Sequence, residues 1–132
     1  MCNILLISHS KQLAQAVYDF VNEMKQKDFK FDYVGGTDHG RQFGSDPQEI
    51  LEKYKKLLKT NSGILVLYDL GSSLLNGKTA LELLENDGDK KRIEFAQCAF
   101  TEGALIAVCA NNEDMTPAQL RKIVEDQCKI NK

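Results

Sequence analysis

The chain has 132 residues, of which 42% are hydrophobic and 27% are charged, and its formal net charge is −2. This length predicts one domain over residues 1–132, and the composition excludes a disordered chain. The near-neutral charge argues against nucleic-acid binding, which depends on neutralising phosphates, and no apolar run approaches the roughly 20 residues of a membrane span.

The first third of the chain predicts a strand, a helix and a second strand. Residues 3–8 are an apolar run ended by polar residues, typical of a strand buried on both faces. Residues 29–34 alternate aromatic and polar side chains, as in a half-exposed strand, and a glycine-rich loop over 35–44 follows. Between the two strands, helical spacing puts four apolar side chains on one face: Leu13, Val17, Phe20 and Met24.

The rest of the chain continues the alternation of helices and strands. A helix is predicted to begin at Asp46, where Pro47 suits the first helical position and Glu49 completes a capping box. Residues 63–68 are apolar and predict another strand buried on both faces. Next, the pattern predicts a leucine-containing helix that ends before residue 86, a strand over 93–96, a helix over 102–110 and a last helix opening at Thr116.

This order of elements is that of an open α/β sheet with helices on both faces. The first and third strands are apolar throughout, so we expect them at the centre, and the second and fourth at the edges. Right-handed crossovers then give the strand order 2-1-3-4. The sequence therefore predicts a flavodoxin-like, three-layer fold with a mostly parallel sheet.

The predicted topology also locates a site. In such sheets ligands bind beyond the carboxyl ends of the strands, where the winding reverses, which here is between the first and third strands. Residues 8–10 and 69–73 flank this point, and residues 35–40 form the third loop beside it. We therefore expect His9, one of only two histidines, to lie near Asp69, with a helix N-terminus directly after each.

This combination favours a phosphohistidine site. A histidine acts as a nucleophile when a carboxylate on its other ring nitrogen fixes the neutral tautomer, so we expect Asp69 to orient the His9 ring. Helix N-termini attract anions, phosphate above all, so backbone amides should hold the phosphoryl oxygens. The candidate phosphoryl-binding residues are Ser10, Thr37, Gly71, Ser72 and Ser73.

The spacing alone leaves simpler interpretations open. His9 and Asp69 could be helix caps, the glycines of 35–40 could be turn residues, and His39 is expected to be an exposed loop histidine. No P-loop and no G-x-S-x-G elbow occurs, which argues against nucleotide binding and serine hydrolysis. A metal site built from His9, His39 and Asp38 lacks ligand spacing, so we expect neither metal nor cofactor. The four cysteines, at 2, 98, 109 and 128, include no C-x-x-C pair and should be reduced.

Four segments that follow the predicted strands resemble one known family. They are Ile-Ser-His-Ser at 7–10, Gly-Gly-Thr-Asp at 35–38, Leu-Tyr-Asp-Leu-Gly-Ser-Ser at 67–73 and Thr-Glu-Gly-Ala at 101–104. In this order they resemble the mannose-type IIA domains of the bacterial phosphotransferase system. Within that family they are most similar to the DhaM-type phosphotransfer subunits of phosphoenolpyruvate-dependent dihydroxyacetone kinases.

The resemblance implies a phosphoryl relay in the cytoplasm. The histidine at the position of His9 is transiently phosphorylated in this family, and the aspartate at the position of Asp69 supports it. The small carrier protein HPr would be the donor, and ADP bound to a DhaL subunit would be the acceptor. DhaL would then phosphorylate dihydroxyacetone bound to DhaK. The short chain suggests a form without fused HPr or enzyme I domains, and a homodimer is expected.

Two other functions remain open from the sequence. The chain could be the IIA component of a mannose-family sugar permease, which would use the same histidine with a different acceptor. It could also be a regulatory module that binds a phosphorylated partner or metabolite without turnover. Formation of an acid-labile, base-stable phosphoryl adduct would separate the carrier functions from the binding module.

Overall fold

Four parallel strands form the centre of the computed structural model, which describes residues 1–132. They are β1 (Asn3–Ser8), β2 (Phe31–Gly35), β3 (Ile64–Tyr68) and β4 (Ile93–Ala96). Their order is β2-β1-β3-β4, and every neighbouring pair is parallel. The predicted strand order and α/β class are therefore confirmed.

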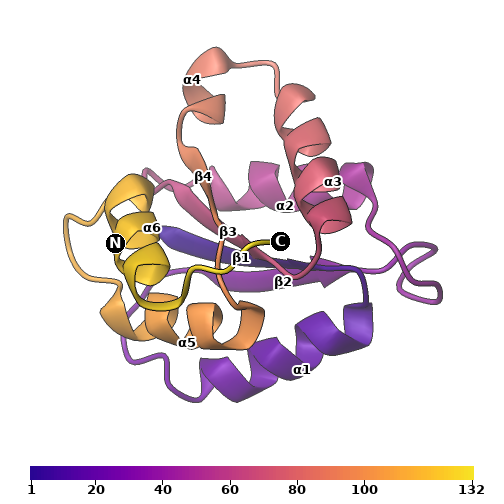
Figure 1. The fold of residues 1–132 in the computed structure, drawn as a ribbon. Coiled ribbons are helices and arrows are strands. Elements are labelled where there is room, and N and C mark those ends of the chain that lie inside the picture. The colour runs from indigo at the N-terminus through magenta and orange to yellow at the C-terminus, as the bar shows by residue number, and fades with distance from the viewer.

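Helices cover both faces of the sheet (Figure 1). On one face lie α1 (Lys11–Asn22), α5 (Phe100–Ala110) and α6 (Pro117–Cys128), and on the other lie α2 (Pro47–Leu57) and α3 (Gly71–Glu82). The short α4 (Asp87–Lys90) connects α3 to β4. None of these helices has the length and apolar character needed to cross a membrane.

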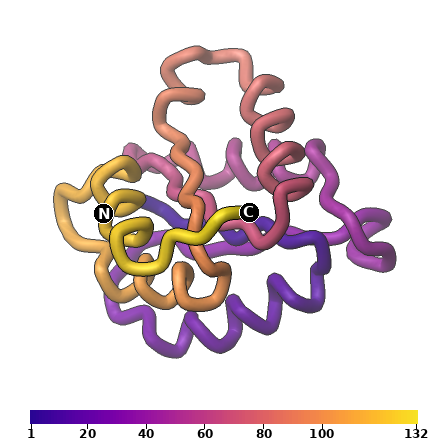
Figure 2. Tube along the Cα trace, viewed as in Figure 1, coloured from indigo at the N-terminus to yellow at the C-terminus, as the bar shows by residue number.

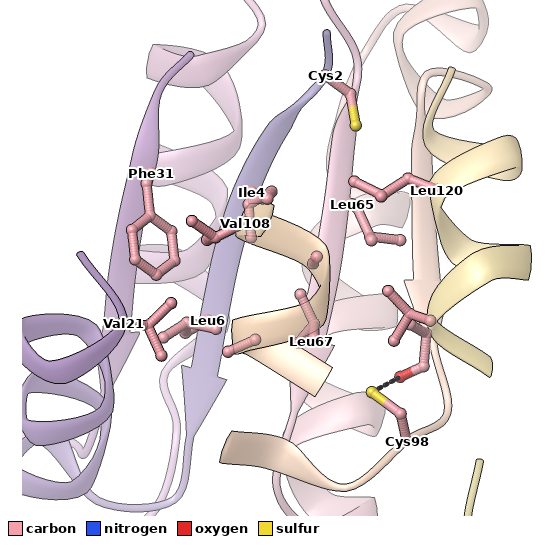
Figure 3. Packing of buried hydrophobic residues seen from close by; sticks show 14 of the residues in the cluster. Cys2, Ile4, Leu6, Val21, Phe31, Leu65, Leu67, Cys98, Val108 and Leu120 are labelled. Carbon is pink, nitrogen blue, oxygen red and sulfur yellow. Dashed lines mark hydrogen bonds between the residues drawn. The ribbon is translucent and has the colours of Figure 1, made fainter. Parts of the chain in front are cut away.

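The two central strands divide their side chains between the two faces, as period-2 alternation requires. Ile4 and Leu6 of β1 belong to a cluster of 16 buried residues beneath α1, α5 and α6, which Figure 3 shows in part. Leu5 and Ile7 belong to a second cluster of 12 residues beneath α2 and α3. Both faces of β1 are thus buried, which explains its continuous apolar sequence.

The starts of two helices follow from local sequence. Asp46 caps α2, because its side chain accepts the N–H of Gln48 at 2.9 Å, and Pro47 occupies the first turn. The cap was predicted, but the reciprocal bond from Glu49 that would complete a capping box is not part of the observed cap. A complete capping box does form at the start of α6, between Thr116 and Gln119.

The apolar face predicted for α1 is only partly buried. Ala14, Val17 and Val21 contact the core, whereas Leu13, Phe20 and Met24 are 44–55% exposed. The spacing correctly predicted the helix, but the buried face is centred on Ala14, Val17 and Val21 and not on the four larger side chains. A small side chain such as alanine allows α1 to pack closely on the sheet, and hydrophobicity patterns underweight it.

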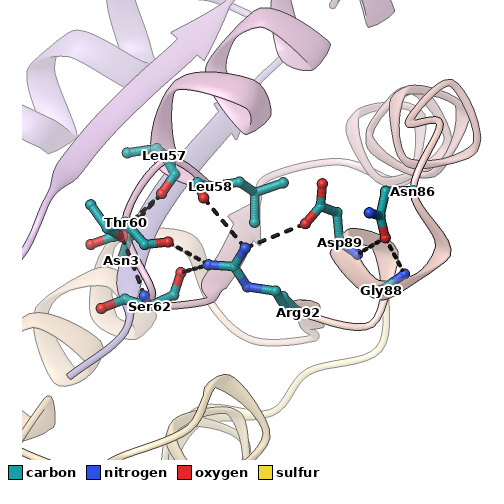
Figure 4. A network of polar contacts seen from close by, with 9 residues as sticks. All are labelled: Asn3, Leu57, Leu58, Thr60, Ser62, Asn86, Gly88, Asp89 and Arg92. Atoms are coloured by element: carbon teal, nitrogen blue, oxygen red, sulfur yellow. Dashed lines mark hydrogen bonds and ion pairs between the residues drawn. The ribbon is translucent and has the colours of Figure 1, made fainter.

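A polar network fixes the amino ends of the strands, opposite the predicted site (Figure 4). The guanidinium of Arg92 donates to the carbonyl groups of Leu58, Thr60 and Ser62 at 3.3, 2.5 and 2.7 Å. Asn3 at the start of β1 donates to the hydroxyl of Thr60 at 2.9 Å. Arg92 is half-buried and joins the start of β4 to the loop between α2 and β3.

Two buried thiols predict how stability depends on pH. Burial raises the pKa of Cys2 from 9.0 to about 11 and that of Cys98, which also lies near Cys128, to about 12. Both pKa values are higher in the folded state, so above pH 9 the unfolded chain loses thiol protons that the folded chain keeps. The free energy of unfolding is therefore unaffected by these thiols below pH 9 and falls as the pH rises towards 11–12. Each pKa unit by which a thiol is raised corresponds to about 1.4 kcal/mol, so we expect the free energy of unfolding to fall by several kcal/mol over this range.

Chemical denaturation at a series of pH values measures this dependence. Cys98→Ala should reduce the loss of stability above pH 9, while Cys109→Ala, which changes an exposed thiol, should leave it as in the wild type. An identical pH dependence in Cys98→Ala and the wild type would contradict the assignment.

Candidate functional site

The three loops expected at the reversal of winding do meet at the carboxyl ends of the strands. His9 follows β1 and Asp69 follows β3, and the backbone N–H of His9 lies 3.2 and 3.1 Å from the two carboxylate oxygens of Asp69. The loop after β2 reaches the same place, because the N–H of Gly44 donates to the carbonyl oxygen of His9 at 2.7 Å. His9 is therefore held through its backbone from two sides.

Asp69 is the centre of a hydrogen-bond network. Besides the His9 N–H, its carboxylate accepts the hydroxyl of Ser8 at 2.7 Å, the hydroxyl of Ser73 at 2.8 Å and the N–H of Leu70 at 2.7 Å. These donors come from the end of β1, the β3–α3 loop and the first turn of α3. Asp69 thus joins the two central strands and the helix that follows at one point.

The predicted contact between Asp69 and the imidazole does not form. The polar neighbour of the ring is Ser72, whose Oγ lies 3.4 Å from Nδ1 of His9. The physical reason is that Asp69 lies beside the His9 backbone N–H, and the donors around it occupy its oxygens. Asp69 therefore fixes the residue that carries the ring, and Ser72 is placed to orient the ring itself.

The start of α3 is open to solvent. Its N-cap residue, Leu70, provides no side-chain hydrogen bond, and Gly71 and Ser72 in the first turn are exposed. First-turn amides lack partners inside a helix, so those of Gly71 and Ser72 are available to an anion. Ser73 differs, because it is fully buried, its amide donates to the carbonyl of Leu70, and its hydroxyl binds Asp69. Its predicted contact with phosphoryl oxygens is therefore not supported.

The loop that carries His9 is also packed closely against the start of α1 and the end of β2. Ser10 caps α1 by accepting the N–H of Leu13 at 3.2 Å, and its own N–H donates to the hydroxyl of Ser8 at 3.0 Å. Gly35, at the end of β2, lies so close that a Cβ there would be 2.8 Å from the carbonyl oxygen of Ser10 and 2.9 Å from that of Ser8. Only glycine fits this position without moving the loop.

The loop after β2 forms a small projecting turn beside the site (Figure 1). Thr37 bridges to Gln42 and packs against Gly44, the residue that binds the His9 carbonyl. His39 is exposed, as expected for a loop histidine, and has a positive φ of 58°. Thr37 thus reaches the surroundings of His9, whereas His39 lies at the exposed end of the turn.

The C-terminal segment is a neighbour of the site that the sequence did not suggest. It runs from α6 towards the β3–α3 loop, as Figures 1 and 2 both show, and Gln97 donates to the Ile130 carbonyl at 2.9 Å. The Lys132 amine donates to the carbonyl of Tyr68 and lies 4.3 Å from the centre of the Tyr68 ring. Partial burial lowers the pKa of Lys132, and the charge of Asp69 opposes this effect. No helix or strand pattern marks a residue in this position.

The site holds no cluster typical of a metal centre, because no three His, Cys, Asp or Glu side chains come together in the structure. A cavity of about 550 Å³ lies next to it, beside β2, and is lined mainly by polar residues such as Lys11, Asp32, His39 and Glu52. His9 and Asp69 do not line this cavity. The candidate site is therefore an open surface around His9.

Comparisons with known proteins identify the family of the chain. A family model described as PTS system fructose IIA component, EIIA-man, matches residues 3–121. The phosphoryl donor subunit DhaM of a PEP-dependent dihydroxyacetone kinase from Providencia stuartii is 31% identical over 112 residues, which cover 83% of this chain and 23% of that protein. The chain thus spans about a quarter of the length of that relative.

Two further matches are of similar length to this chain. The phosphoryl donor subunit DhaM of PEP-dependent dihydroxyacetone kinase 1 from Listeria innocua is 28% identical over 116 residues, covering 86% of this chain and 85% of that protein. The crystal structure of a protein described as being of unknown function superposes with a TM-score of 0.81 at 25% identity. That match covers 95% of this chain and 93% of the other.

Proposed function

Because the chain belongs to the EIIA-man family of phosphotransferase-system IIA components, we propose that it is a phosphohistidine carrier that uses His9. The observation that carries the proposal is the position of His9. It is fixed through its backbone by Asp69 and Gly44, and its ring faces Ser72 at the open start of α3. A nucleophile beside free helix amides is suited to accept a phosphoryl group.

The position of Ser72 indicates which ring nitrogen of His9 is the nucleophile. When Nδ1–H of His9 donates a hydrogen bond to Oγ of Ser72, the lone pair of Nε2 is free to attack phosphorus. In the transfer, the bond between phosphorus and the histidine nitrogen of the donor breaks as the bond to Nε2 of His9 forms. The proton on Nδ1 stays in place, so the step requires no general base.

The phosphoryl oxygens would be held by the backbone amides of Gly71 and Ser72, with the hydroxyls of Ser10 and Thr37 at the edge of the site. A charge near a helix end gains about 0.3–1 kcal/mol, and up to about 2 kcal/mol when partly buried, so several such groups must act together. We propose that this arrangement and the donor protein replace a metal ion, and that no cofactor is needed on this chain.

We place residues 1–132 in the relay as one IIA-type unit in the cytoplasm, working as a homodimer. HPr would donate the phosphoryl group to His9, and ADP bound to a DhaL subunit would accept it and pass it on to dihydroxyacetone on DhaK. Support for this acceptor comes from relatives described as phosphoryl donor subunits of dihydroxyacetone kinases.

Reconstitution tests the acceptor. The chain is labelled with phosphoenolpyruvate, enzyme I and HPr, purified, and mixed with DhaL–ADP, DhaK and dihydroxyacetone. We expect the label to leave the chain and appear in dihydroxyacetone phosphate. If the label stays on the chain in this mixture but moves to the IIB component of a mannose-family permease in a second one, the proposed acceptor is wrong and the sugar pathway is favoured.

The surface around His9 predicts how a donor protein docks. Phe43 is 75% exposed and precedes Gly44, which binds the His9 carbonyl. Three more exposed apolar side chains lie close in sequence to the site: Leu13, Leu70 and Leu75. Exposed aromatic side chains frequently dominate protein interfaces, so Phe43→Ala should raise KM for phospho-HPr about 10-fold and leave kcat nearly unchanged.

Phe20→Ala is the matched control for this measurement. Phe20 is 55% exposed but lies roughly 15 Å along α1 from its capped end, at 1.5 Å per residue. Its replacement should leave both kinetic constants as in the wild type. Equal effects of the two substitutions on KM would contradict a docking surface centred on Phe43.

A further inference from the structure

Two buried serine hydroxyls hold Asp69 from opposite sides. Ser8, at the end of β1, is fully buried and donates to Oδ2 of Asp69 at 2.7 Å. Ser73, in the first turn of α3, is also fully buried and donates to Oδ1 at 2.8 Å. Neither hydroxyl touches the His9 ring, and burial keeps both from a bound phosphoryl group.

The hydrogen bonds around Asp69 fix the orientation of its carboxylate. With both hydroxyls and the N–H of Leu70 in place, the two oxygens of Asp69 both face the N–H of His9. Ser8 extends the network further, because its Oγ also accepts the N–H of Ser10, the cap of α1. A shift of the Asp69 carboxylate would therefore move the His9 backbone relative to the start of α3, where the amides of Gly71 and Ser72 lie.

We propose that Ser8 and Ser73 are positioning residues of the phosphoryl-transfer site, which act only through Asp69. The inference rests on the function proposed for His9. The two hydroxyls fix the carboxylate, the carboxylate fixes the His9 backbone, and the backbone sets where the imidazole lies relative to Ser72 and the α3 amides. Small displacements of a reacting group cost large factors in rate, so loss of either hydroxyl should slow transfer.

A double-mutant cycle separates this role from general stabilisation. Single-turnover rates of transfer from phospho-HPr are measured for Ser8→Ala, Ser73→Ala and Asp69→Ala, and for each serine variant combined with Asp69→Ala. Each serine substitution alone should lower the maximal rate about 10-fold with KM for phospho-HPr unchanged. In the Asp69→Ala background the same substitutions should change the rate less than about 2-fold.

Ser8→Thr and Ser73→Thr test whether the hydroxyl is the group that matters. Each keeps a donor for Asp69 and should retain more of the rate than the corresponding alanine variant. Thr60→Val is the control for loss of a hydroxyl from a polar network at the opposite end of the sheet, where Thr60 accepts from Asn3 (Figure 4). It should lower thermal stability and leave the transfer rate of the folded protein unchanged.

The outcomes distinguish this inference from the proposed function. Equal rate losses from Ser8→Ala with and without Asp69 would overturn the inference, because the serine would then act on another group. Rates of the serine variants equal to that of the wild type would overturn it as well. Labelling of a His9→Ala variant would instead overturn the proposed function, whatever the serine variants do.

Discussion

His9→Ala is expected to abolish phosphoryl transfer to the chain. The side chain is half-buried and lies outside both apolar clusters, so its removal creates no cavity in the core. Its backbone bonds to Asp69 and Gly44 remain possible in alanine. We therefore expect labelling by phospho-HPr to fall below detection while the melting temperature changes little.

His39→Ala is the control, because His39 is the other histidine of the chain and lies in the exposed part of the β2–α2 loop. This variant should be labelled like the wild type. Loss of labelling in His39→Ala together with its retention in His9→Ala would show that the nucleophile has been assigned to the wrong histidine.

Asp69→Asn is expected to slow transfer on the order of 10- to 1,000-fold. Analogous replacements in catalytic triads cost about 10⁴-fold, and transfer between histidines involves less proton movement, so the loss should be smaller. The carboxylate accepts from four groups, whereas an asparagine amide has a single acceptor oxygen. The NH₂ group of the asparagine must face either a hydroxyl or a backbone N–H. Because a backbone N–H cannot accept a hydrogen bond, we expect the His9 loop to shift.

Asp38→Asn provides the matched control, because Asp38 is an exposed carboxylate of the neighbouring loop that pairs with Arg41 at 3.2 Å. We expect this variant to transfer at the wild-type rate. Stopped-flow or rapid-quench measurement of single turnovers compares the two. A rate for Asp69→Asn within a factor of two of the wild type would contradict the role of Asp69.

The fold could be predicted because each strand has a distinct pattern. The runs over residues 3–8 and 63–68 are apolar except at their ends, which predicted β1 and β3 at the centre, and connection rules then determined the strand order. The same order brought His9 and Asp69 to one edge of the sheet. Boundaries were less accurate, since β2 begins at Phe31 although Phe29 is buried like a strand residue.

The contacts within the site could not be predicted in the same way. Sequence places Asp69 beside His9, but whether the carboxylate meets the ring or the backbone depends on side-chain directions that only packing decides. The sequence assigned Ser73 to the phosphoryl group and gave Ser8 no role, because it does not show that either side chain is buried against Asp69. The hydrogen bonds that the two hydroxyls donate to Asp69 become visible only in three dimensions.

The most direct test of the account is to identify the phosphorylated residue in the wild-type chain. The protein is treated with EDTA and apyrase, freed of both, labelled with purified phospho-HPr and digested with trypsin, which places His9 in peptide 1–11 and His39 in peptide 31–41. We predict an acid-labile, base-stable phosphoramidate in peptide 1–11 alone. A label in peptide 31–41, a base-labile acyl phosphate, or labelling only after magnesium or ADP is restored would contradict the account.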